Sequence, residues 1–87
     1  MNNFFGEQEI DVNLIAKRVH ETWMNLKLKE GWSFGANLDL NKKEHPNIVP
    51  FESLSESDKE VDRQTVMATI SYLIENGYTI FKSTTLK

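Results

Sequence analysis

The sequence predicts a small, mainly α-helical fold, in which two antiparallel helices are joined by a packed irregular loop and followed by a short C-terminal β-strand. Two stretches carry apolar residues at helical spacing, one beginning near residue 12 and the other after residue 55. The connection between them, residues 31–54, contains two prolines and two glycines but also many apolar side chains. The length of 87 residues suits a single domain, with a core over about 12–80 and peripheral segments at 1–10 and 82–87.

The first helix is predicted from an apolar stripe about 100° wide. Asp11 or Asn13 is suited to cap its start, and Gly31 is suited to end it. The stripe consists of Val12, Ile15, Ala16, Val19, Trp23 and Leu26. His20 and Lys27 fall on one flank of this stripe, beside Trp23. That flank is polar without being fully exposed, so we expect a binding site to be built there.

The second helix is predicted to start after Ser55, which is spaced from Asp58 as in a capping box, and to stop at Gly77. Its apolar face consists of Val66, Met67, Ile70, Leu73 and Ile74. Residues 78–81 alternate in character and contain β-forming side chains, which predicts the short strand. Before the first helix, Phe4 and Phe5 are too apolar for a solvated tail, and we expect both to dock on the rest of the domain.

The composition excludes several classes of protein. Without cysteine, the chain can form no disulfide, thiolate nucleophile, zinc finger or iron–sulfur cluster. A net charge of −3 argues against a nucleic-acid-binding protein. The sequence has neither a membrane-spanning apolar run nor a signal peptide, so we expect a cytoplasmic protein. Because 39% hydrophobic residues in so short a chain make only a thin core, we expect good helix packing or a second copy of the chain to stabilise it.

A series of uncommon residues recurs in order and at characteristic spacings: His20-Glu21-Thr22-Trp23, Lys27, Gly31-Trp32-Ser33-Phe34-Gly35, Asp39, Lys43, His45-Pro46, Ile48-Val49-Pro50-Phe51, Leu54, Asp62-Arg63, Leu73 and Gly77-Tyr78. This series resembles the RyR domain, the repeat found in pairs in the cytoplasmic region of ryanodine receptor calcium channels. The resemblance covers about residues 12–80 and suggests a stand-alone single repeat of bacterial or phage type.

The resemblance implies two antiparallel helices with a short strand, and an association of two repeats about a pseudo-two-fold axis. A single repeat is then expected to form a homodimer. In some members, the cleft between paired repeats accepts an adenine nucleotide, whose base stacks on the tryptophan of the first helix. Trp23 is the matching residue here. The channel repeats do not form the pore, so the resemblance does not imply ion conduction.

Five residues are the candidates for a ligand-binding cleft: His20, Trp23, Lys27, Trp32 and Arg63. Trp23 would offer an aromatic platform to a planar base, and the cations would neutralise a phosphate. The alternatives are structural. Trp23 also fits ordinary core packing, and Trp32 fits a lid on the helices.

Arg63 lies on the apolar face of the second helix, where an unpaired guanidinium is costly. It either binds a ligand anion in the cleft or forms a buried ion pair, for which Glu21, Asp39 and Asp58 are the candidate partners. His45-Pro46 is interpreted as a structural turn. Two histidines far apart in the sequence make a weak case for a metal site, and we expect no cofactor.

Motifs typical of catalysis are absent from the sequence, which contains no P-loop, nucleophile elbow or H-E-x-x-H. We therefore expect a non-catalytic binding module, homodimeric, with a nucleotide or nucleotide-derived molecule as the candidate ligand. The alternative is a purely structural protein–protein interaction domain without a small-molecule ligand. An enzyme is the third and least favoured hypothesis, and it would require a strongly perturbed carboxylate or histidine in a pocket.

Overall fold

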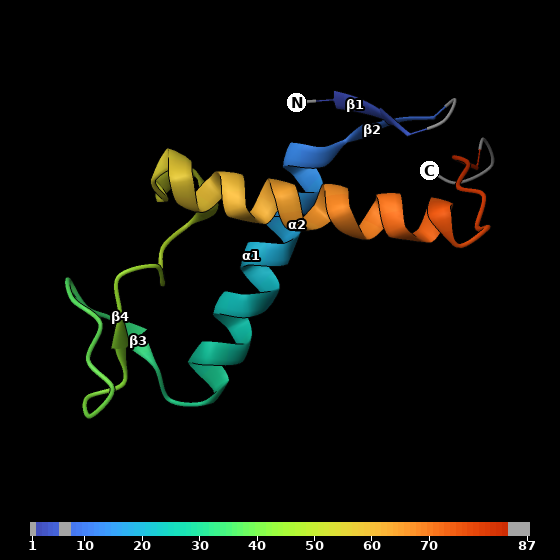
Figure 1. The fold of residues 1–87 in the computed structure, drawn as a ribbon. Coiled ribbons are helices and arrows are strands. Elements are labelled where there is room, and N and C mark those ends of the chain that lie inside the picture. The colour runs from blue at the N-terminus through green and yellow to red at the C-terminus, as the bar shows by residue number, and fades with distance from the viewer. Residues whose placement is uncertain (1, 6–7, 84–87) are drawn as a thin grey trace.

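A computed structural model describes residues 2–5 and 8–83 of the chain. It contains two long helices, two small sheets and one short 3₁₀ helix, η1 (Figure 1). In chain order the elements are β1 (Asn2–Phe5), β2 (Gln8–Asp11), α1 (Val12–Lys29), β3 (Ser33–Phe34), β4 (Glu44–His45), η1 (Phe51–Ser53) and α2 (Glu56–Glu75).

Both helices occupy the stretches that the sequence predicts, and their ends show why. Asp11 caps α1 by accepting a hydrogen bond from the amide of Leu14 at 3.1 Å. Ser55 caps α2 in the same way, accepting from the amide of Asp58 at 3.1 Å. Beyond each C-terminus a glycine adopts a left-handed conformation, Gly31 at φ +90° and Gly77 at φ +92°.

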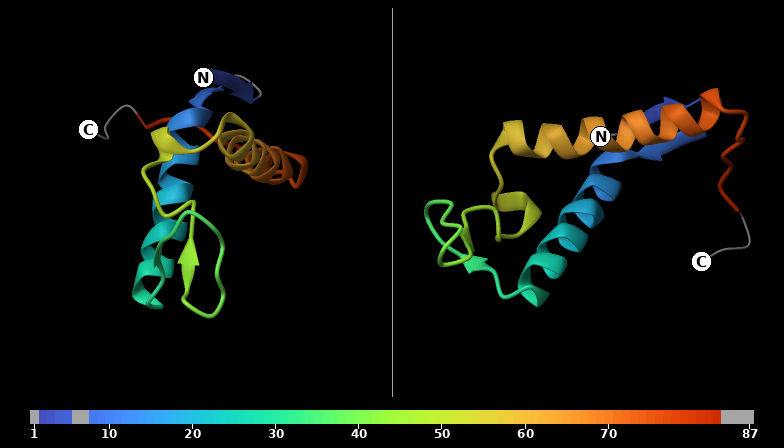
Figure 2. Two further views of the ribbon diagram at one scale, coloured as in Figure 1. Left: turned by 90° about the vertical axis from the view of Figure 1, so that its left-hand side faces the viewer. Right: turned by 60° about the horizontal axis from the view of Figure 1, so that its bottom comes forward.

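The predicted antiparallel pair of helices is wrong. The two helices cross at a steep angle in every view, and the first turns of α1 lie against the middle of α2 (Figures 1 and 2). Antiparallel neighbours in a bundle are usually joined by a short loop. Here the long connection carries the chain from the far end of α1 to the start of α2, so the helices need not run side by side.

The predicted C-terminal strand is also wrong. Tyr78 donates its amide to the carbonyl of Leu73 at 3.0 Å, which continues the helix cap. Further on, the amide of Lys82 bonds the side chain of Gln8 at 3.4 Å rather than a strand backbone. Residues 78–81 therefore lie beside the N-terminal sheet without entering its hydrogen-bond ladder.

The two small sheets make this a small mixed fold rather than the mainly α-helical one that the sequence predicts, and their strands lie outside residues 78–81, where the strand is predicted. β1 and β2 make an antiparallel hairpin in which Phe4 is opposite Glu9. Phe5 packs on the core as expected, but Phe4 is 71% exposed, so the expected docking of both rings is only half right. β3 and β4 make a two-residue parallel pair inside the connection. Gly35, which follows β3, lies very close to Glu44. A Cβ atom on residue 35 would be only 2.6 Å from the Cβ of Glu44, so glycine is required there.

The core lies where α1, η1 and α2 meet. Its buried side chains are Val12, Ala16, Phe51, Leu54, Val66 and Ile70. The second half of the connection is thus packed, as the sequence predicts, whereas Phe34, Leu38 and Leu40 in its first half are exposed. None of the helices in the described part of the chain combines the length and apolar character needed to cross a bilayer.

A cleft between the two helices and the connection

A cavity of about 260 Å³ lies where the middle of α1, the segment after β4 and the start of α2 come together. Its polar and aromatic lining residues are His20, Trp23, His45, Asn47, Asp58 and Asp62, and Val19, Leu54 and Val61 complete it. Two of the five residues expected from the sequence, His20 and Trp23, therefore line one cavity.

His20 and Trp23 are one helical turn apart on α1, and their rings stack with centroids 5.6 Å apart. His20 is only 4% exposed, and its Nε2 donates to the carbonyl of Val49 at 2.7 Å. This bond holds the imidazole in place and ties the connection to α1. Trp23 is half-buried, so part of its indole remains accessible in the cleft.

His45 supplies the second aromatic wall. Its ring meets Trp23 edge-on with centroids 5.0 Å apart, and its Nδ1 accepts the amide of Asn47 at 3.0 Å. That second bond closes a turn, as the structural interpretation of His45-Pro46 predicts. Its place in the cleft could not be read from the sequence, because it depends on how the connection folds back onto α1.

Lys27 and Trp32 lie beside the cleft rather than in its lining. The ammonium of Lys27 is 5.1 Å from the centre of the Trp32 ring, and it is 3.8 Å from a carboxylate oxygen of Glu30. Trp32 in turn meets His45 edge-on at 6.4 Å. A series of contacting aromatic rings thus runs from His20 through Trp23 and His45 to Trp32. It links the cleft to Lys27, which the sequence predicts to be a cation of the site.

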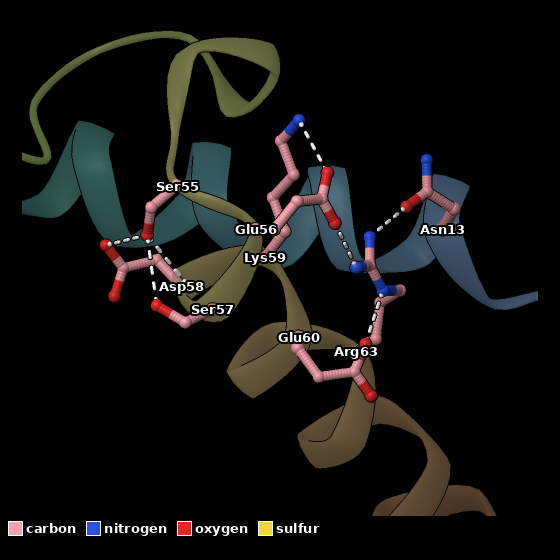
Figure 3. A network of polar contacts seen from close by, with 8 residues as sticks. All are labelled: Asn13, Ser55, Glu56, Ser57, Asp58, Lys59, Glu60 and Arg63. Carbon is pink, nitrogen blue, oxygen red and sulfur yellow. Dashed lines mark hydrogen bonds and ion pairs between the residues drawn. The ribbon is translucent and has the colours of Figure 1, made fainter.

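Arg63 lies outside the cleft lining, at the crossing of the helices (Figure 3). It is 9% exposed, and all its donor nitrogens have partners: Nε bonds Glu60 at 2.9 Å, and the two terminal nitrogens bond Asn13 and Glu56 at 3.0 Å each. Hydrogen bonds to Glu60 and Glu56 raise the pKa of Arg63. The bond from Arg63 lowers the pKa of Glu56, and bonds from Gln64 and Arg63 lower the pKa of Glu60.

This geometry is that of a buried ion pair, but with partners different from Glu21, Asp39 and Asp58. Glu60 and Glu56 lie three and seven residues before Arg63 on the same helix, so they share its face. That spacing was available in the sequence and could have identified both partners.

Two carboxylates that the sequence did not single out as site residues also line the cleft. Asp58 and Asp62 are four residues apart on α2, which places them on one face. The Oδ2 atom of Asp58 accepts from Ser55 Oγ at 2.9 Å and from Asn47 Nδ2 at 3.4 Å. Asp62 has no hydrogen bond or ion pair within the described residues. Burial raises the pKa of Asp62, the charge of Asp58 raises it further, and the nearby His20 opposes both effects.

In residues 2–5 and 8–83, no three histidine, aspartate or glutamate side chains gather in a way that could hold a metal ion. The site is therefore defined by aromatic rings and two carboxylates. Chemically, it is suited to bind a flat group with polar edges.

The structure defines the class of this protein: it is a small domain with two crossed helices, a folded connection and an aromatic cleft. The family model of the RyR domain matches residues 5–82, which is nearly the whole chain. The chain belongs to the RyR domain family.

Proposed function

We propose that this RyR domain is a non-catalytic binding module whose ligand enters the cleft on Trp23. The observation that supports it is a cavity whose walls combine an accessible indole with the carboxylate of Asp62, which has no hydrogen bond to any described residue. Concave sites of this kind, largely apolar with a few converging polar groups, are where small ligands usually bind.

A nucleotide-derived molecule is the first ligand to test. Its base would stack on Trp23, with its exocyclic amino group facing the carboxylates of the cleft. Phosphates would have to reach outward to Lys27, whose ammonium lies beside Trp32. Arg63 is not a candidate phosphate ligand in this proposal, because Asn13, Glu56 and Glu60 already occupy its donors.

Binding without turnover is the simpler proposal for this site. The cleft lining contains no serine, threonine or cysteine among the described residues that could act as a nucleophile. The raised pKa of Asp62 follows from burial, which a binding site also produces. We propose a cytoplasmic location on the sequence argument alone.

A second candidate function is that of a protein–protein interaction domain. It is favoured by an apolar groove of about 170 Å³ where the two helices cross, whose lining includes Ile15, Val19 and Val66. We propose that a second copy of the chain covers this groove, giving a homodimer. This proposal is independent of the ligand, so both can hold together.

The binding proposal is tested by titrating the protein with adenosine, AMP, ATP and ADP-ribose, and by following heat and tryptophan emission. The chain has two tryptophans, so a Trp32→Phe variant makes the emission report on Trp23 alone. We expect binding to change that emission. Trp23→Ala should weaken binding by roughly tenfold to a hundredfold, the range expected for loss of one stacked base.

Trp32→Phe also serves as the control, because it removes an indole beside the cleft but not in its lining. Absence of heat together with unchanged Trp23 emission for all four compounds would show that the cleft does not bind nucleotides.

A further inference from the structure

The cleft has two chemically different walls. His20 and Trp23 from α1, with His45 from β4, supply aromatic faces. Asp58 and Asp62 from α2 supply carboxylates to the same cavity. An indole beside paired carboxylates is the combination that binds organic cations, because the ring face and the carboxylates both attract positive charge.

No lysine or arginine in the described part of the chain forms an ion pair with the carboxylates of this cavity, and only the nearby His20 favours the charged form of Asp62. Asp62 has no ion pair among the described residues, and the side-chain hydrogen bonds that Asp58 accepts come from the neutral groups of Ser55 and Asn47. The two cationic side chains of α2 nearest to Asp58 and Asp62 in the sequence, Lys59 and Arg63, form ion pairs with other carboxylates. Lys59 is 3.5 Å from Glu56, and Arg63 is held by Glu56 and Glu60.

We infer that the cleft takes the guanidinium of an arginine side chain presented by a partner peptide. The planar group would lie against the Trp23 ring and direct its forked N–H donors to Asp58 and Asp62. A lysine ammonium carries the same charge but lacks the flat face and the fork, so it fits this pair of walls less well. The inference rests on the proposed function only in taking this cleft as the binding site.

The electrostatics of the cleft agree with this assignment. Burial raises the pKa of Asp62 and outweighs the opposing effect of His20, so the charged carboxylate is disfavoured in the cleft, and a bound cation would relieve that cost. A phosphate placed in the cavity would instead face both carboxylates. His20 and His45 are the other titratable groups that line it, and protonation of Asp62 at low pH would remove one of the charges that attract the cation. Binding should therefore weaken as the pH falls.

The test compares three blocked five-residue peptides that are identical except for a central arginine, lysine or citrulline. Citrulline keeps the shape of arginine but has no charge. By titration calorimetry at low salt, we expect the arginine peptide to bind most tightly, the lysine peptide less tightly and the citrulline peptide not measurably. Asp62→Asn should weaken arginine binding by about tenfold, as expected for loss of one charge-assisted contact.

Glu75→Gln is the matched control, because it makes the same change in net charge at the far end of α2, outside the cleft. It should leave arginine binding unchanged. Equal binding of the arginine and citrulline peptides, or equal losses in the two variants, would overturn the inference. The peptide comparison on the unchanged protein stands even if a variant fails to fold.

The two proposals fail in distinguishable ways. If nucleotides bind at Trp23 and the arginine peptide does not, the inferred cation is wrong while the proposed cleft stands. If neither binds, the cleft is not a site for either ligand, and both proposals fail.

Discussion

Asp62 and Arg63 are adjacent in the sequence and have opposite surroundings. Successive residues of a helix point about 100° apart, so Asp62 turns toward the cleft while Arg63 turns toward the helix crossing. Arg63 is buried with a full set of partners, whereas Asp62 is half-buried with none among the described residues. A charge that the domain leaves unpaired costs stability, and such groups are typical of sites that bind something else.

At the residue scale, we predict that Asp62→Asn raises the melting temperature at neutral pH. The pKa of Asp62 is raised in the folded state. Its charge therefore lowers stability once the pH exceeds the unfolded pKa of about 3.9, and the cost becomes constant above the folded pKa. Asparagine removes this cost.

The check is thermal unfolding of both proteins from about pH 4 to pH 7. The difference between variant and parent should be largest at pH 7 and should shrink as the pH falls. A variant that melts below its parent at pH 7 would contradict the assigned cause of the pKa shift.

Among the elements, α2 shows how a few polar groups determine where a helix begins. Ser55 accepts the amide of Asp58 and donates to its carboxylate, and Glu56 and Asp58 place negative charge in the first turn (Figure 3). The same first turn holds one partner of Arg63 and one carboxylate of the cleft. The start of α2 therefore positions both the ion pair and the candidate site.

At the element scale, we predict that Ser55→Ala lowers the free energy of unfolding by about 1 kcal/mol, the usual cost of losing a serine cap. Urea denaturation measures this loss, and the dependence of the free energy of unfolding on urea concentration should be the same for the variant and the parent. Ser53→Ala is the control, since Ser53 is exposed in η1 and its side chain makes no hydrogen bond to any residue that the structure describes. Equal losses in both variants would show that the cap is not what stabilises the start of α2.

The whole molecule is more extended than a compact domain of its length. Its radius of gyration is 15.8 Å, against about 12 Å expected for 87 residues. The crossed helices leave apolar residues exposed beside the core, including Ile15 and Val19, which line the groove at the crossing. Exposed apolar surface of this kind is typical of an interface, which supports the proposed homodimer.

At the scale of the whole molecule, we predict a particle of about twice the chain mass of 10.1 kDa at micromolar concentration, measured by size-exclusion chromatography with light scattering. Ile15→Glu should shift this mass toward the monomer, because it places a charge in the apolar groove. Leu14→Glu makes the same kind of change on an exposed neighbour outside that groove and should leave the mass unchanged. A parent protein that is monomeric under these conditions would refute the dimer.

The two helices and their ends could be predicted from the residues alone, because apolar spacing, caps and glycine stops act over a few residues. The sequence also identified His20 and Trp23 as neighbours on one helix face, for the same local reason. The RyR family was recognised from the residues and is shown by the match over residues 5–82.

The crossing of the helices, the pairing of β1 with β2 and the absence of a strand at residues 78–81 became known only from the folded structure. The same holds for the set of residues that share the cleft. His45 comes from the connection, and Asp58 and Asp62 come from α2, so they reach Trp23 only after the long connection has folded back onto α1. Contacts between residues far apart in the chain depend on the packing of whole elements, and no local pattern of residues specifies them.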